Sequence, residues 1–383
     1  MTGLKLFFDI FRFSYYGIFT GLHLALMLGV FLEWRREKKA LKTAAGDLPL
    51  VSVIIPVHNE TGRIRTLLGC LEKQDYPGAE FIFVDDRSDD GSAEMIASFV
   101  EKAGHAVSII TLKENPGPNN KQFALARGIE ASRGEFILFT DADCQIPPYW
   151  IRGMVKRMAD KTVGAIIGPV LKRSGGRGFF HLYECYEHGV RYIYLAGAAG
   201  LGAAGGGFGN NMILRRAALD EVGGYDMVPP SPTEDAALVA RIRSHSKYGV
   251  RAALGEDVHV ITQGEKTWKT LINQTLRWNN GGIFSPDKAT RINYSFLMIT
   301  ITMGVLAFPL LPFIPSIWPL PLGPVTVMVF NTIANLGLFG VSLPRRTFGF
   351  DYLLTLLFMP VYMALMTIMG YFGIKPTWKG KEV

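Results

Sequence analysis

The sequence predicts an α/β domain with a mostly parallel sheet, placed between apolar segments that are long enough to cross a membrane. Residues 50 to 285 alternate short apolar runs with segments of helical spacing, which is typical of βαβ units. One long apolar stretch precedes this region and three follow it. Of the 383 residues, 49% are hydrophobic and 19% are charged. This composition is too apolar for an ordinary soluble domain and too charged for a wholly membrane-embedded protein.

The first apolar stretch, about residues 14 to 33, is long enough to span a hydrocarbon core of ~30 Å. It lacks a small-residue cleavage site and is followed by the basic sequence EWRREKK. We therefore expect a membrane anchor and not a cleaved signal peptide. Three further apolar runs, at residues 293–313, 324–343 and 350–373, predict about three C-terminal transmembrane helices.

Basic residues beside these segments indicate their orientation. By the positive-inside rule, the basic flank at 35–39 places the following domain in the cytoplasm, and Arg345 and Arg346 place the loop before the last span there too. Three C-terminal spans would then leave the basic tail outside, unless the last segment is re-entrant or lies along the interface. The side of the tail stays open. We expect a protein of the cytoplasmic (inner) membrane. Its predicted parts are an N-terminal transmembrane anchor at 1–34, a basic linker at 35–49, a cytoplasmic catalytic domain at 50–285, a C-terminal transmembrane region at 286–375 and a basic tail at 376–383.

Cysteine usage and charge exclude several classes of protein. Cys70, Cys144 and Cys185 are widely spaced, so neither a zinc site nor a disulfide framework is expected. The net charge of +7 fits contact with anionic lipid. No basic module interleaved with aromatic residues indicates nucleic-acid binding. The oligomeric state cannot be predicted.

Acidic residues follow two of the predicted strands. The apolar runs within 50–60, 80–86, 106–112 and 136–140 predict strands, and residues 62–74, 92–104 and 119–132 predict the helices between them. Asp85 and Asp86 end one strand, while Asp141 and Asp143 follow another. In parallel sheets, ligands bind beyond the carboxyl ends of the strands, so these acids are expected to meet at one crevice.

Such a group of carboxylates needs a cation, because neighbouring negative charges raise one another's pKa values. Oxygen ligands suit Mg²⁺ or Mn²⁺, and such an ion would also bridge a diphosphate. Neither a dinucleotide-binding glycine fingerprint nor a P-loop is present. The glycine-rich segment 197–211 follows no clear strand and is interpreted as a flexible loop near the site.

Five motifs, in order, resemble those of family 2 glycosyltransferases, the inverting, nucleotide-sugar-dependent enzymes of the GT-A fold group. They are VSVIIPVHNE (51–60), FIFVDDRSDDGS (81–92), FTDADC (139–144), LDEVGGYD followed by TEDAALVARI (219–242), and QTLRW (274–278). The resemblance covers about residues 50 to 285. It implies a GT-A domain, with a Rossmann-like, mixed and mostly parallel sheet flanked by helices.

The resemblance also implies roles on the donor side of the site. Pro56, Val57 and Glu60 would line the uridine pocket of a UDP-sugar. Asp85 would hold the base or ribose, and Asp86 would support the nucleotide.

The remaining donor-side roles fall on the acidic motif and a lysine. Asp141 would support the nucleotide and the metal, and Asp143 would ligate Mg²⁺ or Mn²⁺ on the diphosphate. Lys121 lies where many members carry Gly-Lys before a helix, but the segment here reads PGPNNKQFAL. Its nucleotide-binding role is therefore expected only from its position.

The catalytic and acceptor roles fall on the last two motifs. Asp235 would be the general base that takes the proton of the acceptor hydroxyl. Arg277 and the metal would stabilise the charge that develops on the departing diphosphate. Glu234, Gln274 and Trp278 would lie at the acceptor and diphosphate end, where Trp278 offers a flat face to a sugar ring.

Three of these motifs also have a purely structural interpretation. Thr233 is a good N-cap residue for the helix after TED. Asp85 and Asp86 suit a turn. Gln274 and Trp278, four residues apart on a helix, suit packing. The aromatic segment 175–197 predicts either a core helix or an interfacial helix that shapes an entrance for a lipid.

The leading functional hypothesis is a membrane hexosyltransferase that passes a sugar from a UDP-sugar, with inversion, to a lipid or lipid-linked acceptor. The anchors favour a lipid acceptor because they hold the domain near the bilayer. A processive polysaccharide synthase is the alternative, because cellulose, chitin and hyaluronan synthases share Q-x-x-R-W. A non-catalytic nucleotide-sugar-binding scaffold is the third, although the expected acids are all present. Neither the sugar nor the acceptor can be named from the sequence.

Overall fold

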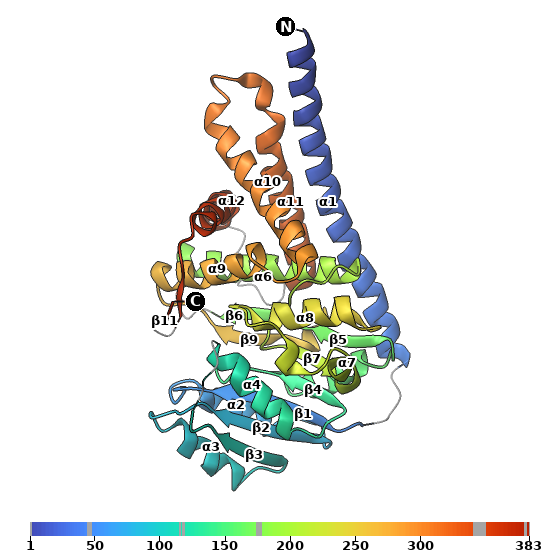
Figure 1. Cartoon of the computed structure of the whole chain (residues 1–383), viewed down its shortest axis with the longest axis vertical. Coiled ribbons are helices and arrows are strands. Elements are labelled where there is room, and N and C mark those ends of the chain that lie inside the picture. The colour runs from blue at the N-terminus through green and yellow to red at the C-terminus, as the bar shows by residue number, and fades with distance from the viewer. Residues whose placement is uncertain are drawn as a thin grey trace. The chain divides into compact units, whose positions relative to one another are not determined.

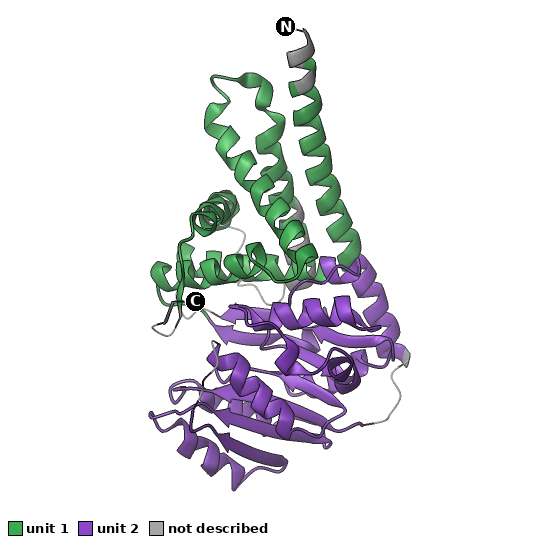
Figure 2. Ribbon diagram, in the orientation of Figure 1, with its two compact units in different colours: residues 1–30, 174–197, 264–383 green, residues 31–173, 198–263 purple. Residues whose placement is uncertain are grey.

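The computed structural model describes residues 2–43, 48–114, 116, 119–173, 178–339, 350–378 and 381–382. The chain divides into two compact units, coloured separately in Figure 2. One unit comprises Met1–Val30, Ser174–Gly197 and Gly264–Val383, and contains most of the long apolar helices. The other comprises Phe31–Arg173 and Ala198–Gln263, and contains the main sheet.

The main sheet has seven strands in the order β3-β2-β1-β4-β7-β5-β8. Its strands are β1 (Val51–Val57), β2 (Ala79–Asp85), β3 (Ala106–Thr111), β4 (Phe136–Phe139), β5 (Val163–Ile167), β7 (Met212–Arg215) and β8 (Gly249–Ala252). Neighbouring strands are parallel except that β7 runs antiparallel to β4 and β5. The prediction of a mostly parallel α/β sheet is therefore confirmed. A two-stranded parallel sheet, β6 (Val170–Arg173) with β9 (Val260–Gln263), completes the strands of this unit.

The first four strands coincide with apolar runs in the sequence, and they are buried or nearly so except for β3 at the sheet edge. Helix α4 (Asn120–Ala131) packs on β1 and β2. A Cβ atom at Gly128 would lie 2.5 Å from Ile54 Cγ2, so only glycine permits this approach. The other helices of the unit are α2 (Ile64–Leu71), α3 (Ser92–Val100), α5 (Trp150–Arg157), α7 (Arg216–Glu221) and α8 (Glu234–His245), with the short helices η1 (Tyr225–Met227) and η2 (Glu256–Val258).

The strand order reverses around β1. From β1 the chain moves outward to β2 and β3, and then returns to place β4 on the other side of β1. In open α/β sheets, ligands bind beyond the carboxyl ends of the strands at such a switch point. Strands β1 and β4 are neighbours in the sheet (Figure 1). Their carboxyl ends lead into the segments that begin at His58 and Thr140, where two of the predicted motifs end.

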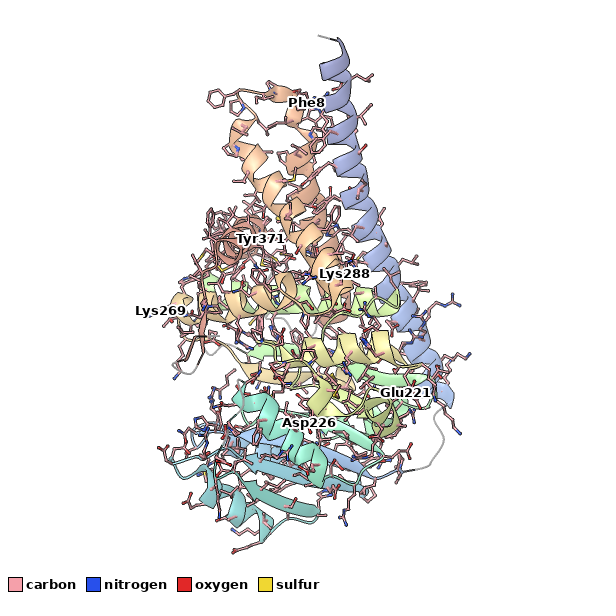
Figure 3. All side chains as sticks on the ribbon, viewed as in Figure 1. Phe8, Glu221, Asp226, Lys269, Lys288 and Tyr371 are labelled. Carbon is pink, nitrogen blue, oxygen red and sulfur yellow. The ribbon has the colours of Figure 1, made fainter. Side chains whose placement is uncertain are left out.

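The helical unit contains α6 (Phe179–Gly200), α9 (Trp268–Ile283), α10 (Lys288–Ala307), α11 (Pro319–Phe339), α12 (Phe350–Tyr371) and the start of α1 (Thr2–Thr43). The last three residues of α6 belong to the other unit. Its short elements are η3 (Phe308–Leu310), η4 (Pro315–Ile317) and the hairpin of β10 (Thr377–Trp378) and β11 (Lys381–Glu382). Among the described residues, four helical segments are long and apolar enough to cross a membrane: Phe8–Lys42, Lys288–Leu310, Pro315–Ile333 and Phe350–Tyr371. Figure 3 labels Phe8, Lys288 and Tyr371, which bound three of them. One N-terminal and three C-terminal apolar helices agree with the prediction.

Helices α1 and α6 touch through their backbones. A Cβ atom at Gly29 would collide with the Gly197 carbonyl oxygen, and a Cβ at Gly197 would lie 2.6 Å from the Leu26 carbonyl oxygen. Nearby, His23 Nε2 hydrogen-bonds to the Tyr194 hydroxyl at 2.8 Å. Two glycines and the His23–Tyr194 hydrogen bond therefore help to join the anchor helix to α6, and Arg36 Nη1 of α1 also donates to the Gly200 carbonyl oxygen of α6 at 2.7 Å.

The elements differ from the predicted segments in three places. Helix α1 continues through residues 35–43, which the sequence suggested as a linker. Residues 178–197 and 264–285, inside the predicted catalytic domain, group with the apolar helices. The glycine-rich segment 197–211 begins as the last turn of α6, because its alanines favour helix, and becomes a loop only after Gly200. Arg345 and Arg346 lie outside the described residues.

Candidate functional site

Lys121 brings together two of the predicted motifs. It lies in the first turn of α4, which is capped by the Asn119 side chain. Its Nζ atom is 2.7 Å from Asp141 Oδ1 and 3.8 Å from Glu234 Oε1. Asn119 Nδ2 also approaches Glu234 Oε2 at 3.3 Å. Because the two acidic groups stabilise the ammonium ion, the pKa of Lys121 is raised in spite of its burial. Lys121, which was singled out by its position alone, thus contacts one residue of the D-x-D motif and one of the T-E-D motif.

Asp235, the predicted base, is half-buried at the start of α8. Its Oδ2 atom accepts a hydrogen bond from Gly209 N at 2.8 Å, and its Oδ1 atom accepts one from Ala236 N at 2.7 Å. Burial and the neighbouring Glu234 charge raise the pKa of Asp235 to about 6, while Lys121 opposes that rise. A carboxylate of this kind is ionised at neutral pH and is still a usable base.

The hydrogen bond from Gly209 places the glycine-rich loop beside Asp235. The sequence analysis predicted that this loop lies near the site. A Cβ atom at Gly209 would lie 3.1 Å from Asp235 Cβ, so a side chain there would crowd the carboxylate. The interpretation of Thr233 as a capping side chain is wrong in one respect. Thr233 occupies the N-cap position of α8, but its side chain makes no capping hydrogen bond, and Asp235 accepts from Ala236 N instead.

Asp143 faces groups that the sequence analysis did not single out. Its Oδ2 atom accepts a hydrogen bond from Thr262 Oγ1 at 3.3 Å and lies 3.5 Å from Arg63 Nη1. The pKa of Asp143 is nevertheless raised, chiefly by burial and then by the negative charge of Asp141. Arg63 also pairs with Glu60, at 2.6 Å between Nη2 and Oε2. Arg63 therefore joins the turn after β1 to the acidic motif after β4.

A sequence signal existed for Arg63 but not for Thr262. Arg63 lies three residues after Glu60, the spacing at which side chains of one helical turn meet. Thr262 had no signal in the sequence, because it reaches Asp143 through a long-range pairing. Gln145, just after the acidic motif, forms an isolated bridge with Ile261 in β9.

The turns after β1 and β2 are built from their own polar groups. Asp85 Oδ1 accepts from Ser88 N at 3.2 Å, and Asp86 Oδ1 accepts from Arg87 Nε at 2.8 Å. His58 Nδ1 donates to the Asp86 carbonyl oxygen at 2.6 Å. Asp85 and Asp86 are 2% and 4% exposed, so the turn-forming interpretation of both residues has direct support.

The residues predicted around the nucleotide differ in their exposure. The Val57 side chain is buried in the core at the end of β1, and its carbonyl oxygen accepts from Asp86 N at 2.8 Å. Pro56 and Glu60 are partly exposed. Nucleotide-binding roles for all three residues, and for Asp85 and Asp86, stay predictions.

The Q-x-x-R-W motif lies on α9, in the helical unit, and the motif forms the predicted helix. Gln274 Nε2 donates to Glu265 Oε1 at 2.9 Å. The Trp278 ring lies 4.8 Å below the Arg191 guanidinium carbon and 5.5 Å from the His188 ring. Roles of Gln274, Arg277 and Trp278 at the acceptor and diphosphate stay predictions.

Asp141 and Asp143 are the candidate ligands of a divalent cation. The described residues hold no group of three or more His, Cys, Asp or Glu side chains with the geometry of a metal site. Two carboxylates still fit Mg²⁺ or Mn²⁺ bound with a nucleotide, because Mg²⁺ commonly takes one or two carboxylates and completes its shell with water and phosphate oxygens. The raised pKa of Asp143 agrees, since a nearby cation would relieve the repulsion from Asp141.

Comparison with known proteins identifies the family. The sequence profile described as Glycosyl transferase family 21 matches residues 18–383. The chain belongs to glycosyl transferase family 21. This family is of the same GT-A type as family 2, so the resemblance drawn from the motifs is confirmed.

Two curated relatives support the assignment of this family 21 glycosyltransferase. The probable glycosyltransferase YdaM of Bacillus subtilis is 28% identical over 280 residues, which cover 68% of this chain and 62% of the relative. The β-monoglucosyldiacylglycerol synthase of Trichormus variabilis is 26% identical over 337 residues, which cover 83% of this chain and 70% of the relative. The chain thus spans less than two thirds of the length of the Bacillus relative.

A solved structure supports the fold. It is the mannosyltransferase PcManGT of Pyrobaculum calidifontis, in complex with GDP-mannose and Mn²⁺. The TM-score is 0.57 at 20% identity, and the match covers 94% of this chain and 99% of that one. The GT-A fold prediction is therefore confirmed for the family 21 chain.

Proposed function

We propose that this family 21 glycosyltransferase moves a hexose from a UDP-sugar to a lipid or lipid-linked acceptor, with inversion at the anomeric carbon. The observation that carries this proposal is the contact of Lys121 with both Asp141 and Glu234, next to Asp235. It gathers a cation, a candidate metal ligand and a candidate base at the edge of the sheet where α/β folds bind nucleotides.

The proposed reaction is a single displacement. Asp235 takes the proton of the acceptor hydroxyl while that oxygen forms a bond to the anomeric carbon. The bond between this carbon and the diphosphate oxygen breaks, and its electron pair leaves with UDP. The pKa of about 6 suits Asp235 to this role, because most of the carboxylate is ionised at neutral pH.

Positive charge must balance the departing diphosphate. A divalent cation bound by Asp143 and Asp141 would supply part of that charge when present. Lys121 holds Asp141 at 2.7 Å, so it fixes the orientation of a proposed metal ligand. We assign the remaining positive charge at the diphosphate to Arg277, on the resemblance of the Q-x-x-R-W motif.

The donor nucleotide would bind over the turns after β1 and β2. We assign Pro56, Val57 and Glu60 to the uridine side, with Asp85 and Asp86 supporting the ribose and base. The Glu60–Arg63 pair suggests one further feature of this side. Arg63 lies within 3.5 Å of Asp143, so it can hold Glu60 toward the acidic motif.

Two observations support a lipid acceptor. In the part of the chain that the structure describes, four helices are long and apolar enough to cross a membrane, which would hold the transferase beside lipid substrates. The curated relative from Trichormus variabilis is named for a glycolipid, monoglucosyldiacylglycerol. We assign Glu234, Gln274 and Trp278 to the acceptor end. We also place the catalytic domain, residues 50–285, on the cytoplasmic side of the inner membrane, because the helix end at 35–39 is basic.

The test is release of UDP by the purified protein in detergent. A panel of UDP-sugars is supplied with Mg²⁺ or Mn²⁺, with and without a membrane lipid extract, and GDP-mannose is added because a protein of this fold binds it. Asp235→Asn is the catalytic variant. Asp226→Asn is its matched control, because Asp226 is an exposed acid of the same unit, labelled in Figure 3.

We expect lipid-dependent UDP release that needs the metal, is kept in Asp226→Asn and falls by at least ~10²-fold in Asp235→Asn. Mass spectrometry of the extract then names the acceptor. A long polymer would instead support a processive synthase. UDP binding without any transfer would support a scaffold, and absence of nucleotide-sugar binding would overturn the proposal.

A further inference from the structure

Trp278 of the Q-x-x-R-W motif is held by side chains of a different helix. Arg191 and His188, both on α6, approach its ring, which lies on α9. The Arg191 guanidinium carbon is 4.8 Å from the ring centroid, and the His188 ring is 5.5 Å from it and tilted by 41°. Helices α6 and α9 therefore lie side by side at this point (Figure 1).

Arg191 is itself fixed from two sides. It forms an ion pair with Glu187, one turn earlier on α6, and the two side chains are 15% and 1% exposed. The Tyr294 hydroxyl, on α10, also lies near enough to interact electrostatically with the Arg191 guanidinium. A planar guanidinium can stack on an aromatic face and bind a carboxylate through its edge at the same time, which a lysine cannot do.

The chain of contacts returns to α9 beside Trp278. The Tyr294 hydroxyl donates to Asn279 Oδ1 at 2.8 Å, and Asn279 is the next residue after Trp278. Helix α10 can approach this closely because Gly282 faces the Tyr294 ring, where a Cβ atom would lie 2.5 Å from Tyr294 Cδ1. Both faces of the helix around Trp278 are thus restrained from α6 and α10.

We propose that Arg191, oriented by Glu187, is a positioning residue that fixes the Trp278 ring for the acceptor. This inference rests on the proposed function, which assigns Trp278 to the acceptor end. It adds two residues of α6, Glu187 and Arg191, that lie outside every predicted motif. A desolvated guanidinium over an indole is among the stronger cation–π arrangements, so its loss would free the ring to turn.

A double-mutant cycle tests whether Arg191 acts through Trp278. The variants are Arg191→Met, Trp278→Leu and their combination, with Arg191→Lys as the conservative change. Lys269→Met is the control, because Lys269 is an exposed cation on α9 (labelled in Figure 3). The readouts are kcat/KM for the lipid acceptor, KM for the donor and the melting temperature.

We expect Arg191→Met to lower acceptor kcat/KM by about tenfold, with the donor KM unchanged, and Arg191→Lys to recover only part of the loss. In the Trp278→Leu background, Arg191→Met should cost less than about twofold, because the ring is already absent. Additive losses, or a rise in donor KM that parallels the fall in acceptor kcat/KM, would overturn the proposal. A lower melting temperature is expected in any case, because Glu187 stays buried without its partner.

A spectroscopic measurement separates this proposal from the proposed function. The chain has six tryptophans, so the fluorescence of Trp278 must be separated from that of the others. For each protein, acrylamide quenching is measured with and without the additional change Trp278→Phe, and the difference gives the quenching of Trp278. We expect Trp278 to become more accessible to quencher in Arg191→Met and not in Lys269→Met. If the native protein transfers no sugar, the proposed function fails. Whatever the result for transfer, an unchanged Trp278 quenching signal in Arg191→Met would reject Arg191 as the positioning residue of Trp278.

Discussion

The ammonium group of Lys121 lies 2.7 Å from a carboxylate oxygen of Asp141, and this pair connects α4 to the segment after β4. The same ammonium is 3.8 Å from Glu234, beside the proposed base. Lys121 is therefore a cation shared by the D-x-D and T-E-D motifs.

Replacing Lys121 with methionine should reduce transfer strongly. The change leaves three acidic groups near one another without their shared cation, so Asp141 loses its fixed orientation. We expect kcat/KM to fall by about 10²-fold or more, while Lys156→Met, a change of an exposed lysine on α5, leaves it unaltered. Steady-state kinetics with saturating metal measure both. Near-native rates in Lys121→Met would mean that this lysine has no part in the reaction.

The rate should depend on pH through Asp235. A base works in its deprotonated form, so a pKa raised to about 6 predicts that kcat/KM rises with pH through about 6 and is level above about 7. Burial raises this pKa most, the Glu234 charge raises it further, and the Lys121 charge lowers it. Tyr225, which is buried and neutral, also faces the pair.

The position of this rise should respond to its neighbours. Removing the Lys121 charge should move the rise to higher pH, and Glu234→Gln should move it to lower pH. Both follow from the sign of each charge at Asp235. Profiles of kcat/KM between pH 5 and 8 would decide, and identical midpoints in all three proteins would show that another group titrates.

Four strands of the main sheet, β1 to β4, could be predicted from the sequence, because they are continuous apolar runs and acidic residues follow two of them. Phe136–Phe139 is such a strand, and Asp141 follows it as expected. Lys121 was singled out only by its position, and its contacts place it beside Asp141 and Glu234, while its nucleotide-binding role stays a prediction. Thr262 and Arg191 could not be found in this way. Each acts through a partner more than eighty residues away, and no local spacing encodes such a contact.

The end of α1 shows a second limit of local reasoning. The basic sequence after the first apolar stretch suggested a linker, yet Glu37 within it is buried in the sheet-containing unit. Its Oε1 atom accepts from Arg157 Nε at 2.5 Å and from the backbone N atoms of Leu254 and Gly255 at 3.0 Å. Asp257 completes the group by binding both terminal nitrogens of Arg157 at 2.8 Å.

Arg157→Met should therefore destabilise this unit. Breaking a buried ion pair by removing one partner typically costs about 3–5 kcal/mol, because the other charge stays buried. Arg152→Met is the matched control. Its pair with Asp75 is about one third exposed on both sides, where such pairs contribute roughly 0–1 kcal/mol. Thermal unfolding in detergent should show a clear loss for Arg157→Met and little for Arg152→Met.

The double variant Glu37→Gln, Arg157→Met sharpens this prediction. If the cost comes from the uncompensated Glu37 charge, the double variant should unfold at a higher temperature than Arg157→Met alone. A double variant that is less stable than either single one would point to packing and not to charge.

The crossing of α1 and α6 gives the most direct structural prediction. Gly29 and Gly197 are in backbone contact, and a methyl group at Gly29 would overlap the Gly197 carbonyl oxygen. Since that obstacle is backbone, it cannot turn aside as a flexible side chain would, and the two helices must separate. Gly29→Ala should therefore lower the melting temperature and weaken the contact between His23 and Tyr194.

Gly21→Ala is the control, because a Cβ there meets nothing within 4 Å. A cysteine pair placed on α1 and α6 near the crossing should crosslink readily in Gly21→Ala and poorly in Gly29→Ala. Equal crosslinking and equal melting temperatures would show that these helices do not approach as closely as two glycines allow.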